Sequence, residues 1–145
     1  TSGYVSRYAG AAGGNVGYSG DGGPATSAGI AQPLGLFLST TGILYFADSG
    51  NNVIRAIDTK TTIITTFAGK QGASVLGDGG PATSAMMSPF GVWGNTAGVI
   101  FITDTNYNRI RKVVNGNITT IAGTGNANYN GDDIAATVAD LYNPY

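Results

Sequence analysis

Short apolar segments alternate with turn-forming residues over most of the chain. The segments are four or five residues long, which suits β-strands rather than helices. Glycine-containing pairs separate them, and one pair, Asn115-Gly116, is the most typical two-residue hairpin loop. The pattern predicts two groups of four strands, one at 34–38, 43–47, 53–57 and 63–67 and the other at 90–93, 99–103, 109–113 and 117–121.

The second strand of each group is apolar on both of its faces. Segment 43–47 reads Ile-Leu-Tyr-Phe-Ala, and segment 99–102 reads Val-Ile-Phe-Ile. A strand that buries both faces needs one sheet packed above it and another below it. Four-stranded sheets of this size that stack face to face around an axis are the blades of a β-propeller. We therefore expect an all-β chain of four-stranded antiparallel blades.

An internal repeat sets the boundaries of the blades. The nine-residue segment at 20–28, Gly-Asp-Gly-Gly-Pro-Ala-Thr-Ser-Ala, recurs letter for letter at 77–85 and in degraded form at 131–139. Ala-Gly pairs at 9–10, 68–69 and 122–123 keep the same register. We interpret the chain as one propeller segment, 1–145, that comprises the outer strand of a preceding blade (1–8), a first repeat (9–67), a second repeat (68–121) and the start of a third (122–145).

These motifs resemble the NHL repeat as bacterial and algal multi-repeat proteins carry it. The resemblance rests on the nine-residue segment, on the Pro-X-Gly after it, on Leu-Tyr-Phe-Ala-Asp-X-X-Asn-X-X-Ile-Arg at 44–55 and on Ile-Thr-Thr-X-Ala-Gly at 64–69. It covers essentially the whole chain and implies the propeller fold. The resemblance does not identify the function, because NHL propellers include protein-binding, RNA-binding, sensor and, rarely, enzymatic domains. It also implies that Arg55 and Arg111 pair with a nearby aspartate or carbonyl.

The predicted blades are open at both ends. Two blades cannot close a ring, because propellers have at least about four. Something must therefore cover the apolar faces of the terminal blades. The expected partners are further copies of the chain, as a homo-oligomer or filament, or the remaining blades of a longer chain, and the absence of an initiator Met favours the latter. The predicted inter-protomer strand, which aligns with 63–67 and 117–121, comprises Tyr4, Val5, Ser6, Arg7 and Tyr8.

Charge and composition exclude several classes of function. Seven basic and eight acidic side chains give a net charge of −1, which creates no field that attracts nucleic acid or an anionic membrane. Cysteine and histidine are absent, so thiolate ligands, cysteine nucleophiles, the usual general base and the commonest metal ligand are all missing. No apolar run reaches the roughly 18 residues of a membrane span. We expect no enzyme, no cofactor and no metal site.

Polar and aromatic residues gather on the expected face where the loops between second and third strands meet the connections between blades. The recurring aspartates there can bind Ca²⁺, but Asp and Asn side chains also cap turns, and their recurrence favours the structural role. Tyrosine rings beside amides can instead recognise a glycan or a peptide. The candidate ligand-binding face comprises Tyr18, Asp48, Asn51, Asn52, Asp104, Asn106, Tyr107, Asn108 and Tyr129, with Asp21, Asp78 and Asp132 beside them.

One N-glycosylation sequon begins at Asn117, after the Asn115-Gly116 turn and on the opposite face of the expected propeller. A glycan at Asn117 depends on eukaryotic secretion. The low charge and the absence of reactive side chains suit a durable scaffold. The first hypothesis is therefore a non-enzymatic structural assembly module, extracellular or at the cell surface. The alternative is a ligand-binding propeller that recognises a glycan or a peptide on its loop face.

Overall fold

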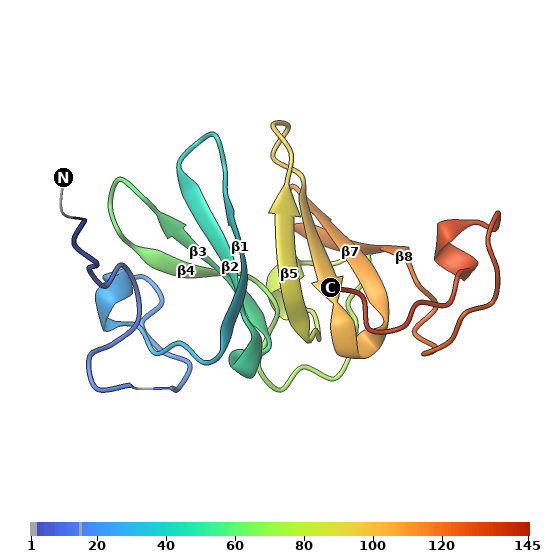
Figure 1. Cartoon of the computed structure of the whole chain (residues 1–145), viewed down its shortest axis with the longest axis horizontal. Helices are drawn as coiled ribbons and strands as arrows, with labels where there is room; N and C mark the ends of the chain where they lie inside the picture. Colours follow the sequence, from blue (N-terminus) through green and yellow to red (C-terminus); the bar gives the residue numbers. More distant parts are fainter. Residues whose placement is uncertain (1–2, 15) are drawn as a thin grey trace.

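The computed structural model describes residues 3–14 and 16–145. Within these residues, eight β-strands form two antiparallel sheets of four, each in sequence order (Figure 1). The first sheet comprises β1 (Pro33–Leu38), β2 (Ile43–Asp48), β3 (Val53–Asp58) and β4 (Ile64–Ala68). The second comprises β5 (Pro89–Gly94), β6 (Ile100–Asp104), β7 (Arg109–Val114) and β8 (Asn117–Ala122). The predicted strands are confirmed across the described ranges, and each end differs from its prediction by no more than one residue.

Left-handed residues make the tight turns between strands. The loop from β2 to β3 is a 3-10 helix, η2 (Ser49–Asn51), that ends at Asn52 with a φ of 58°. The loop from β6 to β7 repeats this with η4 (Thr105–Tyr107). Asparagine tolerates the left-handed region because its short side chain bonds locally. Asn115 and Gly116, with φ of 49° and 78°, form the two-residue hairpin loop that their sequence predicts.

The nine-residue repeat segment forms the connection between blades. Each copy contains a short 3-10 helix: η1 (Ala25–Ser27), η3 (Ala82–Ser84) or η5 (Ala136–Val138). In all three copies the glycine of the preceding Ala-Gly pair donates a backbone hydrogen bond, 2.8 to 3.0 Å long, to the first residue of this helix. In the first two copies the segment also bonds to the fourth strand of the blade that follows it. The third copy has the same local conformation, but the described chain contains no fourth strand after it.

The two sheets pack face to face, with β1, β2 and β3 against β5 (Figure 1). Gly35 of β1 lies directly against Gly91 of β5, and a Cβ atom on Gly35 would lie 2.6 Å from the Gly91 Cα atom. No side chain fits there, so the Pro-X-Gly motif permits close approach of neighbouring blades. The core between the sheets consists of Ala47, Ile54, Ala68, Ala82, Ala85, Met87, Val92, Ile100, Ile102, Val113 and Ile118.

Burial of the second strands follows the sequence prediction in part. β2 buries three successive residues, Phe46, Ala47 and Asp48, so its C-terminal half is covered on both faces. The first half of β2 is only half-buried. In β6 the buried residues alternate, because Ile100 and Ile102 pack in the core between the sheets, whereas Phe101 and Thr103 are only half-buried. On the side away from the second sheet, Phe46 is covered by Ala25 and Ala28 of the connection rather than by a further blade.

The two chain ends lie outside the sheets. Residues 4–8, predicted as an outer strand, form no strand within the described chain, and their side chains are exposed. A strand forms only where another strand pairs with it, and this chain provides none for residues 4–8. After β8 the chain runs outward through η5 and returns, so that the C-terminus lies beside the second sheet (Figure 1). None of the helices in the described residues is long and apolar enough to span a membrane.

Candidate functional site

Each blade contains a fully buried arginine between two aspartates. In the first blade, Arg55 on β3 donates from Nη1 to Asp48 Oδ2 at 3.2 Å and from Nη2 to Asp21 Oδ1 at 2.8 Å. The backbone carbonyls of Gly29 and Ser19 accept further hydrogen bonds from the same guanidinium, at 3.3 and 3.2 Å. Arg55 therefore joins the end of β2, strand β3 and the connection that precedes the blade.

The second blade repeats this arrangement around Arg111 on β7. Arg111 Nη1 donates to Asp104 Oδ2 at 3.0 Å, and its Nη2 donates to Asp78 Oδ1 at 2.9 Å. Burial raises the pKa of Asp104, while hydrogen bonds from the Ser88 backbone N–H and from Arg111 act in the opposite direction. The expected pairing of both arginines with aspartate or carbonyl groups is confirmed.

Four of the nine predicted face residues lie inside the molecule, which corrects the prediction that they form a ligand surface. Asp48 and Asp104 are completely buried, and Asn51 and Asn108 nearly so. Asp48 Oδ1 accepts hydrogen bonds from the Ala31 backbone N–H and from Asn51 Nδ2, at 2.8 and 2.9 Å. A buried carboxylate must be paired and hydrogen-bonded, and these contacts meet that need. Their role in the fold is to hold the β2–β3 and β6–β7 turns.

Tyr18 lies at the edge of the first arginine cluster. Its ring covers the Arg55 guanidinium, with the arginine Cζ atom 5.2 Å from the ring centroid. Its hydroxyl shares a 2.6 Å hydrogen bond with Thr66 Oγ1 and donates to Asp21 Oδ2 at 3.2 Å. In the third repeat, Tyr129 bonds to Asp132, and this hydrogen bond raises the pKa of the Tyr129 phenol. Each of these tyrosines therefore contacts the connection aspartate three residues after it.

The remaining predicted face residues do not gather into one site. Asn52 is exposed at its turn, and the half-buried Tyr107 accepts a hydrogen bond at its carbonyl from Arg109. Asn106 is exposed and donates to Ser88 Oγ at 2.8 Å. Within the described residues, no group of three or more acidic side chains is placed to hold a metal ion.

A polar groove of about 580 Å³ lies beside Tyr18, between the first connection and the second. Sequence reasoning identified Tyr18 and Asp21 and missed the other residues of this groove. Most of them are polar, which the sequence shows, but their proximity depends on how the two connections pack. The groove is lined by Tyr18, Asp21, Thr66, Gly69, Lys70, Gln71, Thr83 and Ser84.

The first blade has an uncovered apolar face, here called the N-terminal face. It surrounds a hollow of about 570 Å³. Leu36 on this face is 68% exposed, whereas Val92, the residue in the same repeat position of β5, is 8% exposed because the first sheet covers it. The N-terminal face is lined by Tyr8, Ala9, Gly10, Ile30, Pro33, Leu34, Leu36, Leu44, Phe46 and Ile57.

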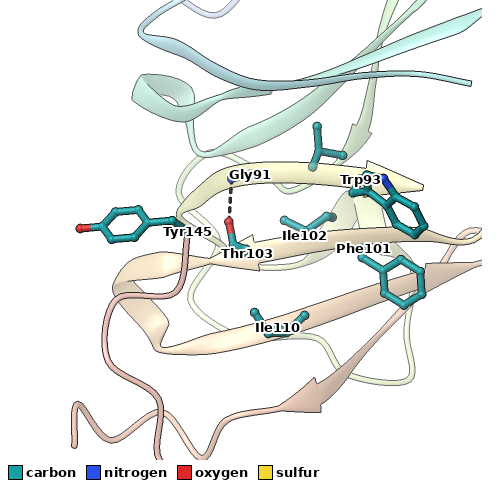
Figure 2. A pocket seen from close by; sticks show the side chains of 8 residues that line it. Gly91, Trp93, Phe101, Ile102, Thr103, Ile110 and Tyr145 are labelled. Atoms are coloured by element: carbon teal, nitrogen blue, oxygen red, sulfur yellow. Dashed lines mark hydrogen bonds between the residues drawn. The ribbon is translucent and has the colours of Figure 1, made fainter. Parts of the chain in front are cut away.

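The second blade has an uncovered face on its opposite side, here called the C-terminal face (Figure 2). It holds a smaller hollow of about 220 Å³ between Trp93 and Phe101 at one end and Tyr145 at the other. Trp93 is 59% exposed. Gly91 lies in the middle of this face, where its N–H donates to Thr103 Oγ1 at 2.6 Å. The residues around the hollow are Gly91, Val92, Trp93, Phe101, Ile102, Thr103, Ile110 and Tyr145.

The last two residues dock on this face as the start of β5 docks on the first blade. Ser49 Oγ donates to the carbonyl of Pro89 at 2.6 Å, and Thr105 Oγ1 donates to the carbonyl of Pro144 at 2.7 Å. The Tyr145 ring then meets the edge of Phe90, 5.0 Å between centroids. Pro144 and Tyr145 thus occupy the place of the first residues of a next blade.

Two further predicted sites are located by the structure but not tested by it. Asn117 is exposed at the first position of β8, next to the hairpin loop. Val5, in the predicted inter-protomer strand, is fully exposed, although the residues in the same repeat position, Ile64 and Ile118, are completely buried. Both assignments stay predictions.

Comparison with known proteins finds similarity to a curated protein and to solved structures. The chain is 34% identical over 113 residues to NHL repeat-containing protein 2 of Bos taurus, a match that covers 69% of this chain and 15% of that protein. An auxiliary nutrient binding protein from Bacteroides thetaiotaomicron superposes with a TM-score of 0.60 and 24% identity, over 82% of this chain and 32% of its own. A candidate phosphatase from the same bacterium superposes with a TM-score of 0.53 and 20% identity, over 74% of this chain and 28% of its own.

The chain therefore spans about a third or less of each of these proteins. No family model matches it. The two solved structures share too little sequence to indicate more than the fold. The curated relative shares both the repeat type and a substantial part of the sequence. Together with the two antiparallel four-stranded blades and the repeated connections, these similarities show that the chain belongs to the NHL-repeat β-propeller family.

Proposed function

We propose that this chain is a non-enzymatic structural module whose NHL blades are completed by neighbouring copies or by the remaining blades of a longer chain. The completed assembly is a ring, a long propeller or a filament, outside the cell or at its surface. One observation carries the proposal: repeat positions that are buried between the two blades are exposed at the ends. Leu36 against Val92 is the clearest pair, at 68% and 8% exposed.

The energetic argument concerns apolar side chains left in water. Fully burying a leucine side chain is worth about 1.5 to 3 kcal/mol. The N-terminal face exposes Leu34 and Leu36 on one strand, and the C-terminal face exposes Trp93. Contiguous exposed apolar surface of this kind marks an interaction site in soluble proteins. Covering each face with a blade gives it the packing that the inter-blade core already has.

The geometry of the two faces also supports a head-to-tail arrangement. In the observed interface, the side of the first blade opposite its N-terminal face packs on the side of the second blade opposite its C-terminal face. The free sides are the N-terminal face of the first blade and the C-terminal face of the second. Each end is therefore the complement of the other, and repeated contacts of this type close into a ring or continue as a filament.

Sedimentation velocity over a range of protein concentrations tests this proposal. Whether neighbouring copies or the remaining blades of a longer chain complete the assembly, the isolated 145-residue chain exposes both faces. We therefore expect it to self-associate as its concentration rises. Leu36→Lys places a charge on the N-terminal face and is expected to shift the chain toward monomer. The matched control, Thr40→Lys, adds the same charge at the exposed β1–β2 turn and is expected to have no effect. A chain that stays monomeric at every concentration contradicts the proposal.

A second candidate function, recognition of a glycan or a peptide, is supported by the polar groove beside Tyr18. The groove offers hydroxyl, amide, carboxylate and ammonium groups within about 580 Å³. Binding to an immobilised oligosaccharide panel tests it. Lys70→Ala, inside the groove, is expected to abolish binding, whereas Lys60→Ala, at the exposed β3–β4 turn, is expected to retain it. Absence of binding, or equal loss in both variants, argues against this function.

A further inference from the structure

The polar groove beside Tyr18 is lined by two sets of side chains that differ in how they are held. In the first set, the Tyr18 hydroxyl donates to Asp21 Oδ2 at 3.2 Å and shares a 2.6 Å hydrogen bond with Thr66 Oγ1. Asp21 Oδ1 accepts a further hydrogen bond from Arg55 at 2.8 Å. These side chains are therefore fixed, and both oxygens of the Asp21 carboxylate already have donors.

The second set of lining side chains lacks such contacts. Lys70 and Gln71 follow β4, and Thr83 and Ser84 lie in η3 of the second connection. All four are exposed, and none of their side chains has a hydrogen-bond or ion-pair partner among the described residues. They offer an ammonium group, an amide and two hydroxyls whose bonding capacity is unused by the protein.

The internal repeat indicates that the fold does not require these polar groups. Gln71 and Ser84 align with Gly125 and Val138, which have no side-chain group that forms hydrogen bonds. Lys70 aligns with an uncharged threonine. By contrast, the aspartate of the connection and the threonine of the fourth strand are the same in both repeats. The unused polar groups are thus a feature of this groove rather than of the repeat.

The chemistry of the lining favours a saccharide over a peptide. The described residues that line the groove include no apolar side chain apart from the Tyr18 ring, whereas peptide recognition depends on pockets for anchoring side chains. A sugar presents closely spaced hydroxyls that both donate and accept, as the Gln71 amide and the Ser84 hydroxyl do. The groove volume of about 580 Å³ lies within the range of about 300 to 1,000 Å³ that is usual for small-ligand sites.

Lys70 adds a positive charge to the unused groups. Its ammonium has three donors and no acceptor, so the ligand group that it binds must accept hydrogen bonds. An anionic acceptor binds it more strongly than a neutral hydroxyl, because charge-assisted hydrogen bonds are roughly twice as strong. Asp21 is engaged by Arg55 and Tyr18 rather than by Lys70. A sugar that carries an anionic group therefore matches both the ammonium and the hydroxyl-binding groups.

We propose that this groove binds an acidic saccharide, in which Lys70 pairs with a carboxylate or a sulfate group while Gln71, Thr83 and Ser84 bind sugar hydroxyls. The inference rests on the second candidate function, recognition of a glycan in this groove, and it names the class of the sugar. Carboxylate and sulfate share the anionic oxygens that Lys70 recognises, and the experiment separates the two.

Isothermal titration calorimetry of the 145-residue chain with three galactose trisaccharides tests the inference. One trisaccharide is neutral, one is trigalacturonic acid, which carries carboxylates, and one carries sulfate groups. We expect an acidic trisaccharide to bind about tenfold more tightly than the neutral one, because a charge-assisted hydrogen bond replaces a neutral one. Added salt is expected to reduce this preference, since Lys70 is exposed and its charge is screened.

Four variants identify the groups that bind. Lys70→Gln keeps a hydrogen-bond donor but removes the charge, so it is expected to lose the preference for the acidic sugar and to keep binding the neutral one. Lys70→Arg is expected to retain the preference. The matched control, Lys60→Gln, removes a charge at the exposed β3–β4 turn and is expected to behave as the parent chain. Ser84→Val introduces the residue that the third connection has at this position and is expected to weaken binding of all three sugars alike.

Two kinds of result overturn the inference at different points. If the neutral trisaccharide binds as tightly as the acidic ones, or if Lys70→Gln retains the preference, the inference fails while glycan recognition stands. If none of the three trisaccharides binds, the inference also fails, and the wider oligosaccharide panel then decides the second candidate function separately.

Discussion

At the scale of single residues, the most informative finding is that the repeated aspartates and arginines form clusters that join each connection to its blade. Arg55 and Arg111 are completely buried, and so are Asp48 and Asp104. Removing one partner of such a pair leaves an uncompensated charge in the interior, which is far more costly than loss of a surface ion pair. The repeats preserve these residues because each cluster fastens a connection to its blade.

Arg111→Met is therefore expected to lower the free energy of unfolding by about 3 to 5 kcal/mol, the usual cost of breaking a buried pair. Adding Asp104→Asn to this variant is expected to recover part of the loss, because the remaining side chain is then neutral. Denaturation in urea measures both effects. Arg7→Met, at an exposed position, serves as the control and is expected to leave the midpoint unchanged. If Arg111→Met loses as little free energy of unfolding as the control does, the structural role of the cluster is contradicted.

The pH dependence of the same variant follows from Asp104. Burial raises the pKa of this carboxyl, so the folded state holds its proton more tightly than the unfolded state does. Without Arg111 to oppose this effect, the unfolding free energy of Arg111→Met should rise as the pH falls from about 7 to about 5. The double variant with Asp104→Asn should lack this rise. The opposite slope, with stability falling toward acid, would show that Asp104 stays ionised and is stabilised by other groups.

At the scale of elements, the strands were predictable because their apolar runs and turn pairs are local in sequence. Asn115-Gly116 is an example, since the loop type follows from those two residues alone. The conformation of the connections was not predictable, because it depends on hydrogen bonds to strands more than 30 residues away, such as the bond from Gly22 N to the Ile64 carbonyl at 2.8 Å. The burial of Asn51 and Asn108 was also missed.

The contact between Gly35 and Gly91 gives the clearest prediction for an element. Gly35→Ala would place a methyl group 2.6 Å from the Gly91 Cα atom and 2.7 Å from the Phe90 carbonyl oxygen, so β1 and β5 must move apart. Overpacking of this kind costs about 1 to 3 kcal/mol. Urea denaturation should show this loss, together with a weaker near-ultraviolet circular dichroism signal from the aromatic residues at the interface. Gly3→Ala, with no atom within 4 Å of the added Cβ, should behave as wild type.

At the scale of the whole molecule, the count of repeats predicted that the ends are open, and the structure adds which side chains are uncovered. Leu36 and Trp93 mark the two free faces, and Val5 marks the segment that has no sheet of its own. The number of blades in the complete assembly was not predictable, because each blade contacts only its immediate neighbours and the same contact recurs in rings and in open stacks. Blade number is thus a property of the assembly.

The most direct test of the central claim is an electron cryomicroscopy reconstruction of the particle purified from its native source. We expect a further four-stranded blade to cover each free face, and residues 4–8 to lie as the fourth strand of the blade that precedes Pro33. A particle that consists of two blades alone, with Leu36 and Trp93 in contact with solvent and residues 4–8 unpaired or folded back on the same chain, would contradict it.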